Sequence, residues 1–357
     1  MKVKIGDLTK IRTGKLDANA SSEDGQYPFF TCSREPLKIS TYSYDCECVL
    51  VAGNGDLNVK YYNGKFDAYQ RTYIIEDNGS GKLFMPYLYY FMEGYIEELR
   101  KQAIGGVIKY IKLGNLTDAL ITLPSIEEQK AIVNILEKAK TLLDIRTAEI
   151  CKLDELIKSR FVELFGDPKY NKSNLVKIGE IGALTSGGTP SRAKPEYFEG
   201  DIRWYSAGEL NSLYLPDSVE HISEMALQQS SAKLFNKDTL MIGMYDTAAF
   251  KMGILTEDSS SNQACANLNP KQGYNIVWLY YLFDIMKPIF LQERQGVRQK
   301  NLSLSKIKEF EVPFAPFELQ EQFATFVEQV DKLKVEVQKS LDETQTLFDS
   351  LMQEYFG

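Results

Sequence analysis

The chain has 357 residues, of which 44% are hydrophobic and 25% are charged. That length favours more than one domain, and the composition is that of a globular protein and not of a disordered one. No apolar run is long enough to cross a bilayer, and the first residues lack the apolar segment of a signal peptide. We therefore expect a cytoplasmic protein without a membrane partner.

The side chains argue against several kinds of chemistry. His221 is the only histidine, which disfavours a catalytic triad or a histidine-rich metal centre. The five cysteines are scattered, and only Cys46 and Cys48 lie close in sequence, so we expect reduced thiols and no metal site. Asp217 and Glu220 lack the following lysine of a nuclease carboxylate motif. The sequence therefore predicts no catalytic residues.

The net charge of −8 is unevenly distributed. Residues 1–124 carry 15 basic and 15 acidic side chains, and residues 167–316 carry 16 and 17. Residues 317–357 carry only 3 basic side chains against 9 acidic ones. Either large block can therefore present a basic face, although an acidic total alone disfavours nucleic acid as a partner.

Residues 1–124 predict a compact α+β domain. Strand-like runs such as 49–51 and 72–75 alternate with predicted turns that contain glycine and asparagine, for example 53–55 and 63–64. A helical pattern follows over residues 86–99. This block is the first predicted head.

Residues 125–166 predict one long helix. Ser125 suits an N-cap, acidic residues follow in the first turn, and Gly166 suits the end of the helix. Arg146 interrupts an apolar stripe with three- and four-residue spacing. The stripe consists of Ile132, Leu136, Ala139, Leu143, Ile150, Leu153 and Ile157.

Residues 167–316 predict a second α+β head with a helix over 275–290, and residues 317–357 predict a second long helix. Its stripe consists of Phe323, Phe326, Val330, Leu333, Val337, Leu341, Leu347 and Leu351. Such spacing is typical of coiled coils, and about 40 residues at a rise of 1.5 Å give a rod of roughly 60 Å. We expect the two helices to pair antiparallel, with an interface formed by Ile132, Leu136, Leu143, Leu153, Ile157, Phe326, Val330, Leu333, Val337, Leu341 and Leu351.

The sequence contains an internal repeat. Residues 3–8 recur at 176–181, an offset of 173, and residues 88–90 recur at 279–281, an offset of 191. The second offset also relates Gln129 to Gln320. The predicted fold is therefore α+β, with two globular domains in a pseudo-two-fold repeat, separated by two long antiparallel, coiled-coil-like helices. Such symmetry suits two-fold partners or two half-sites on DNA.

Polar and aromatic turns of both heads contain residue types that bind DNA. Arginine and lysine suit phosphates and guanine edges, glutamine suits adenine, and glycine lets a backbone N–H approach a phosphate. Taken singly, each residue is better explained by core packing or a solvated surface, and the cluster is suggestive only because the same kinds of turn recur in both heads. The candidates are Arg12, Thr13, Lys15, Tyr62, Lys65, Gln70, Arg71 and Lys109 in the first head, and Ser186, Thr189, Ser191, Arg192, Arg203, Tyr205, Arg294, Arg298 and Lys300 in the second.

In their order, these motifs resemble the specificity subunit of type I restriction-modification systems over the whole chain. The first head is similar to a target-recognition domain of that family, and the second is similar to another common type. Residues 123–129 and 164–168 resemble the entry and exit of the family's conserved helix. The resemblance rests on 13–19, 27–31, 52–55 and 66–71 in the first head, and on 187–191 and Trp204 in the second.

The resemblance implies that each head reads one half of a gapped, asymmetric double-stranded DNA target. The helix pair would set the gap and dock two methyltransferase subunits, which bind S-adenosylmethionine and methylate adenine. Nuclease-translocase subunits using ATP and magnesium would add restriction. The chain itself would hold no cofactor and catalyse nothing.

Two other functions stay open at this point. The chain could be a coiled-coil scaffold whose heads bind proteins, or a carboxylate-dependent hydrolase, although no spacing shows two converging acids. Matching basic patches on both heads would favour DNA recognition. Because the charge is neutral to acidic, we expect weak DNA binding by the chain without its partners.

Overall fold

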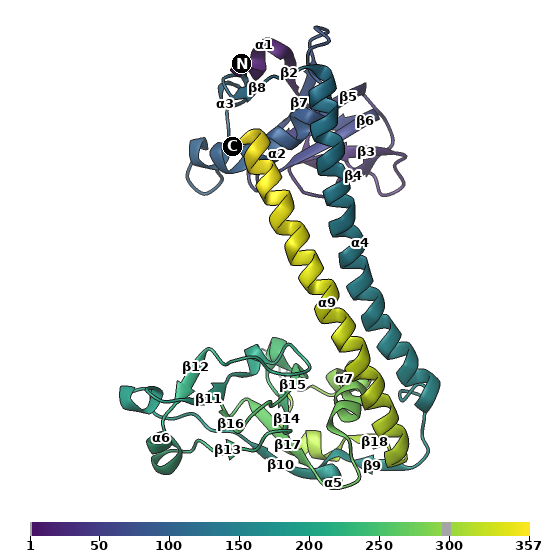
Figure 1. The fold of residues 1–357 in the computed structure, drawn as a ribbon, viewed down its shortest axis with the longest axis vertical. Helices are drawn as coiled ribbons and strands as arrows, with labels where there is room; N and C mark the ends of the chain where they lie inside the picture. The colour runs from purple at the N-terminus through teal and green to yellow at the C-terminus, as the bar shows by residue number, and fades with distance from the viewer. Residues whose placement is uncertain (1, 295–300) are drawn as a thin grey trace. The chain divides into compact units, whose positions relative to one another are not determined.

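The computed structural model describes residues 2–294 and 301–357 and divides the chain into two compact units. Unit 1 comprises Met1–Ala148 and Gln338–Gly357, and unit 2 comprises Glu149–Val337. Each unit therefore combines one predicted head with part of each long helix (Figure 1). Both units mix helices and strands, which confirms the predicted α+β class.

Unit 1 is built on a six-stranded sheet in which only β3 and β6 pair in parallel. Its strands, in spatial order, are β2 (Thr9–Thr13), β7 (Thr72–Asp77), β5 (Tyr44–Ala52), β6 (Val59–Ala68), β3 (Tyr27–Phe30) and β4 (Leu37–Ile39). Val49 and Val51 of β5 pack with Leu88 and Met92 of α2 (Met85–Gln102) in one core. Alternate residues, such as Leu50, point to a second cluster on the other face.

One turn prediction in this sheet is wrong. Asn63 and Gly64 lie inside β6, opposite Glu47 and Cys46 of β5. Gly64 has a φ of 137°, which glycine tolerates because it has no Cβ, so the strand continues through a position that reads as a turn. The predicted turn at 53–55 is confirmed between β5 and β6.

Unit 2 contains two four-stranded sheets. The first consists of β10 (Gly182–Ser186), β17 (Cys265–Pro270), β14 (Leu240–Gly243) and β15 (Met252–Ile254), in spatial order. The second consists of β12 (Glu220–Ile222), β11 (Ile202–Tyr205), β16 (Ser259–Ser261) and β13 (Leu234–Phe235). Helix α6 (Glu224–Gln229) follows β12, and α7 (Ile276–Gln292) packs into the main core of the unit.

The predicted repeat is confirmed by the order of the elements. Unit 1 pairs β1 (Lys2–Lys4) with β8 (Leu120–Thr122), and α1 (Ile5–Leu8) and α3 (Leu113–Thr117) accompany this pair. Unit 2 repeats the arrangement with β9 (Leu175–Lys177), β18 (Glu311–Pro313), α5 (Ile178–Ile181) and α8 (Leu304–Glu309). Equivalent ion pairs join the two ends of each head: Lys4–Asp118 at 2.7 Å and Lys177–Glu309 at 2.5 Å.

The long helices are α4 (Ile126–Phe165) and α9 (Phe317–Phe356), each of 40 residues. Ser125 and Glu128 form a capping box: the Ser125 N–H donates to Glu128 Oε2 at 2.8 Å, and Ser125 Oγ accepts from the Glu128 N–H at 3.3 Å. Gly166, with a φ of 73°, ends α4 as predicted.

The helices pair antiparallel where both lie in unit 2. The rings of Phe161 and Phe323 are 5.2 Å apart, and Asp154 lies 2.5 Å from Lys334. The contacts therefore progress towards the N-terminus of α4 as they progress towards the C-terminus of α9, which is the order of an antiparallel pair.

The predicted stripe of α9 is wrong at two positions. Leu333 is 56% exposed and Leu347 is 54% exposed, whereas their neighbours Lys334 and Phe348 are partly buried. The packed face follows three- and four-residue steps from Val330 through Lys334, so Leu333 is turned by about 100° from it. The amino group of Lys334 bonds Asp154 and Asp331 while its stem packs.

The remaining predicted interface residues are at least partly buried. Leu136, Ile157 and Val330 are fully buried in the cores of their units. The half-buried ones are Ile132, Leu143, Leu153, Phe326, Val337, Leu341 and Leu351.

A buried glutamine fastens each long helix to its head. The side-chain Oε1 of Gln129 accepts from the Phe84 N–H at 2.8 Å, and its Nε2 donates to the Lys82 and Pro124 carbonyls at 2.9 and 3.0 Å. In unit 2, Gln320 Oε1 accepts from the Asn275 N–H at 2.8 Å, and its Nε2 donates to two carbonyls. The sequence repeat at these positions is thus a repeat of one contact.

Candidate nucleic-acid interface

Several loops of unit 1 meet where β2, β3 and β6 end and β7 begins. The Gly14 N–H donates to the Thr72 carbonyl at 3.0 Å, and the Gln70 N–H donates to the Leu16 carbonyl at 2.9 Å. The Gly53 N–H donates to the Arg71 carbonyl at 2.8 Å. We call residues 13–17, 30–34, 53–56, 69–71 and 104–110 the loop end of unit 1.

Gly14 shows why the sequence folds this way locally. A Cβ at this position would lie 2.1 Å from the Ala68 carbonyl oxygen, closer than any side chain permits. Only glycine lets the end of β2 approach the 68–72 segment so closely. The glycine therefore shapes the surface by backbone packing.

The loop end collects five of the predicted DNA-binding residues, and all five are exposed. They are Thr13, Lys15, Gln70, Arg71 and Lys109. Gln70 Nε2 donates to Asp17 Oδ1 at 2.9 Å. Within residues 2–294 and 301–357, the three cations of this set form no ion pair, so their charge faces solvent.

Asp56, an acid within the loop end, is neutralised. Arg34 and Arg100 each lie 3.1 Å from one of its carboxylate oxygens. The hydrogen bond from Arg34 lowers the pKa of Asp56, so this carboxylate stays charged and paired. Arg34 is a loop-end residue that sequence reasoning missed, because nothing in the sequence distinguishes it from other surface arginines.

Three first-head candidates lie outside the loop end. Arg12 is bound to Glu76 at 2.7 Å and stacks on the Tyr44 ring at 4.7 Å. The Tyr62 ring packs on Phe66, and Lys65 is exposed over the Tyr42 ring at 4.7 Å. The hydrogen bond with Tyr42 raises the pKa of Lys65, which stays cationic. These contacts assign Arg12 and Tyr62 to packing.

In unit 2, Gly187 and Gly188 of the turn 186–192 do not offer the free N–H groups that a phosphate contact would need. The N–H groups of Gly187 and Gly188 donate to the Cys265 and Ser261 carbonyls at 3.2 and 2.8 Å, so neither is free for a phosphate. A Cβ on Gly188 would lie 1.9 Å from the Ser231 carbonyl oxygen. Both glycines are needed for close backbone packing.

Arg192 is held at the surface of unit 2 by one acid and one aromatic ring. It forms a two-pronged ion pair with Glu220, with Nη2 2.7 Å from Oε2, and its guanidinium lies 4.4 Å from the centre of the Phe198 ring. The bond from Arg192 lowers the pKa of Glu220. A planar guanidinium fixed in this way is preorganised, but its charge is already compensated.

The other candidates near Arg192 are held by hydrogen bonds or exposed. Thr189 Oγ1 donates to Gln263, and the Ser186 carbonyl accepts from Lys233 Nζ at 2.9 Å. Ser191 is exposed.

Arg203 and Tyr205 lie on β11 and face acids and the core, respectively. Arg203 Nε is 2.8 Å from Asp217 and 3.0 Å from Glu257. Tyr205 is buried, and its hydroxyl donates to the Pro216 carbonyl at 2.6 Å. The prediction that Tyr205 contacts DNA is therefore wrong, because its ring is buried and its hydroxyl is hydrogen-bonded within the protein.

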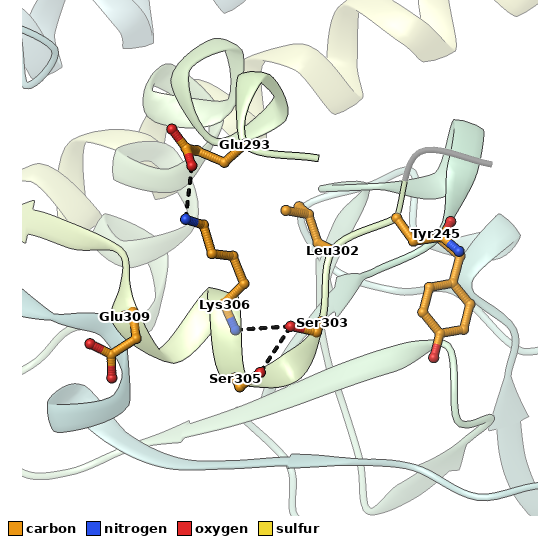
Figure 2. Close-up of a pocket in the computed structure, with 8 residues that line it drawn as sticks. Tyr245, Glu293, Leu302, Ser303, Ser305, Lys306 and Glu309 are labelled. Carbon is orange, nitrogen blue, oxygen red and sulfur yellow. Dashed lines mark hydrogen bonds and ion pairs between the residues drawn. The ribbon is translucent and has the colours of Figure 1, made fainter. Parts of the chain in front are cut away.

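Arg294 lies at the end of α7, where its Nε donates to the Leu291 carbonyl at 3.0 Å. Next to it, Glu293 and Lys306 form a 2.8 Å ion pair across a pocket of about 520 Å³ (Figure 2). In unit 1 the equivalent positions form a 3.1 Å hydrogen bond between Asn115 and Gln102. The other candidates here, Arg298 and Lys300, lie outside the described residues.

Two features of the described residues bear on other functions. Among the described residues, no group of three or more histidine, cysteine, aspartate or glutamate side chains is placed to hold a metal ion. No helix in this part of the chain is long and apolar enough to span a membrane. The acids Asp217 and Glu220 each bond an arginine and do not converge on a shared site.

The family described as type I restriction modification DNA specificity domain matches residues 1–155 and 170–344. The EcoDI specificity subunit of Escherichia coli is 40% identical over 227 residues, which are 64% of this chain and 48% of that protein. The MjaIX specificity subunit of Methanocaldococcus jannaschii is 30% identical over 162 residues, 44% of this chain and 37% of that protein. The chain thus spans about half or less of these relatives' own lengths.

Solved structures show the same fold. The S subunit of a type I restriction-modification system from M. genitalium has a TM-score of 0.64 at 18% identity, covering 100% of this chain and 96% of that one. A second solved chain has a TM-score of 0.62 at 16% identity, and the match covers 100% of this chain and 97% of that one. It comes from a structure described as showing complex assembly and conformational transition of the type I R-M system. With the family match over most of its length, the chain belongs to the type I restriction-modification DNA specificity family.

Proposed function

We propose that this chain is the DNA sequence-recognition subunit of a type I restriction-modification complex. Each head reads one half of a gapped, asymmetric target, and the two long helices set the gap. The observation that carries the proposal is the loop end of unit 1, where backbone hydrogen bonds bring together the loops that carry exposed Lys15, Arg71 and Lys109, none of which forms an ion pair among the described residues. Cations of this kind contact phosphates and set the register of a protein on a duplex.

The chain acts with partners in this proposal. Two methyltransferase subunits dock on α4 and α9, bind S-adenosylmethionine and methylate adenine at N6. Restriction subunits using ATP and magnesium join where the system cleaves DNA. The chain supplies binding and orientation, and its own residues carry no catalytic step.

The two heads contribute differently to affinity. The described arginines Arg192 and Arg203 of unit 2 are compensated by acids, whereas the loop-end cations of unit 1 are not. This difference supports two unlike half-sites and a target that is not a palindrome. It also supports weak binding by the chain alone, because partner subunits must add phosphate contacts.

Exchanging residues 1–124 for another head tests the proposal. In the assembled complex, one half of the methylated motif should change and the other half should stay the same. A change in both halves would contradict the modular reading.

A salt titration adds a second readout. In the assembled complex, Arg71→Ala should make the negative slope of log affinity against log salt shallower by about 0.9, the value of one phosphate contact. Lys172→Ala, an exposed lysine outside the loop end, serves as the control and should leave the slope unchanged. Equal slopes for Arg71→Ala and the unaltered complex would remove the loop end from the interface.

A further inference from the structure

The segment 104–110 of the loop end exposes apolar side chains. Val107 is fully exposed, Ile108 is 63% exposed and Ile104 is 44% exposed. Single exposed apolar residues are ordinary on protein surfaces, but several within one short loop mark a contact surface. We call Val107 and Ile108 the apolar tip.

The loop that carries the apolar tip is closed by backbone hydrogen bonds. Ile104 and Tyr110 exchange two backbone hydrogen bonds of 3.0 and 2.9 Å, which close the loop like a short hairpin. Gly105 has a φ of 119°, and a Cβ there would lie 2.6 Å from the Ile108 carbonyl oxygen, so the turn depends on glycine. The tip is therefore presented without a large ordering cost on binding.

The root of this loop is tied to the cationic part of the loop end. The Gly55 N–H donates to the Lys109 carbonyl at 3.0 Å, and the Ile111 N–H donates to the Gly53 carbonyl at 2.9 Å. Gly53 in turn bonds the Arg71 carbonyl. The apolar tip thus extends from a surface whose exposed cations favour a polyanion. Of its two acids, Asp56 is paired with two arginines and Asp17 accepts a hydrogen bond from Gln70.

We propose that the apolar tip enters the major groove of the first half-site and contacts thymine methyl groups. This inference rests on the proposed function and assigns specificity-determining residues to it. The major groove admits a two-stranded ribbon, and the thymine C5-methyl is the apolar group exposed there. Two β-branched aliphatic side chains next to Lys109 match that chemistry, since the lysine suits a neighbouring phosphate while the tip reads the base.

The test replaces thymine by deoxyuridine, which removes only the methyl group. The complex of this chain with its methyltransferase subunit is assayed on duplexes carrying one such replacement at each A·T pair of the first half-site. That half-site is the one that changes when residues 1–124 are exchanged. We expect a loss of about fourfold in methylation rate per buried methyl group at one or more positions.

The complex that carries the double variant V107S/I108S should methylate the unmodified duplex more slowly. Its methylation rate should not fall further when deoxyuridine replaces thymine at those positions. The control is Val219→Ser, which replaces an exposed valine of unit 2. This variant should show the full deoxyuridine effect in the first half-site. Because both tip residues are exposed, the variant should fold and assemble normally, which native mass spectrometry of the complex checks.

Three results would overturn the inference. The unaltered complex could show no deoxyuridine effect in the first half-site, or V107S/I108S could keep that effect. A loss of complex assembly in V107S/I108S would assign the tip to a protein partner instead. In each case, methylation of a gapped motif by the unaltered complex would still support the proposed function, whereas its complete absence would overturn both.

Discussion

Replacing the buried glutamine of α9 by alanine tests how the long helix is attached to its head. Gln320 is fully buried, and its amide bonds the Asn275 N–H and the carbonyls of Gly273 and Ala315. Asn275 also caps α7, with its Oδ1 accepting from the N–H groups of Val277 and Trp278. Gln320→Ala therefore removes three bonds at the place where α7 begins and α9 leaves the head.

The structure sets the size of the effect. Each lost bond leaves a backbone group without its partner, at a net cost of about 1 kcal/mol, so the variant should lose about 3 kcal/mol. For a unit of this size, 1 kcal/mol moves the melting temperature by about 2–4 °C. Gln320→Ala should thus lower the melting temperature of unit 2 by about 6–12 °C.

Tryptophan fluorescence measures this unit selectively, because both tryptophans, Trp204 and Trp278, lie in unit 2. The matched control is Gln322→Ala, an exposed glutamine on the same helix, which should shift the transition by less than about 2 °C. In unit 1, Gln129→Ala should speed amide hydrogen exchange around Phe84. A Gln320→Ala midpoint within about 2 °C of the control would refute the reasoning that the buried amide fastens helix to head.

Three further predictions concern backbone packing, charge and spacing. Gly188→Ala should destabilise unit 2 by several kcal/mol in thermal denaturation because its Cβ meets a carbonyl oxygen, whereas Gly106→Ala, with open space around it, should be near neutral; equal effects would contradict this. The ion pair of Arg192 with Glu220 stabilises the fold at pH values above the ordinary pKa of Glu220, and this stabilisation is lost as the pH falls through the lowered pKa of Glu220. Arg192→Ala should therefore return the pKa of Glu220 towards 4.5 in an NMR titration. An unchanged pKa of Glu220 would count against the pair. Lengthening α4 by one turn, about 5.4 Å, should widen the methylated motif's gap by about one to two base pairs. A changed half-site with an unchanged gap would argue against the helices as a ruler.

Much of the fold follows from local patterns in the sequence. The helix over 126–165 was predictable because Ser125, the apolar spacing and Gly166 all act within a few residues of one another. The repeat was predictable because equivalent contacts, such as those of Gln129 and Gln320, need the same residue at the same place.

Other features depend on contacts between distant segments. Gly64 reads as a turn but continues β6, because pairing with β5 decides its state. The sequence places Leu333 on the apolar stripe, but Lys334 takes the inner position because Asp154 of the other helix satisfies its charge. No local pattern contains that information.

The candidate site was predictable by residue type more than by position. Lys15, Arg71 and Lys109 lie far apart in the sequence, and only the folded strand ends bring the loops that carry them together. Tyr205 is a residue type that often contacts DNA, but here it is buried in a cluster of core residues, and its hydroxyl donates to the Pro216 carbonyl. Val107 and Ile108 follow two glycines in the sequence, yet only their exposure separates them from core residues.

The most direct test of the central claim is a map of modified bases. This chain is co-expressed with its methyltransferase subunit in a host that lacks DNA methylation, and N6-methyladenine is located across the genome. The account predicts methylation within one gapped, two-part motif with unlike halves. An assembled complex that is supplied with S-adenosylmethionine and methylates no such motif would contradict it.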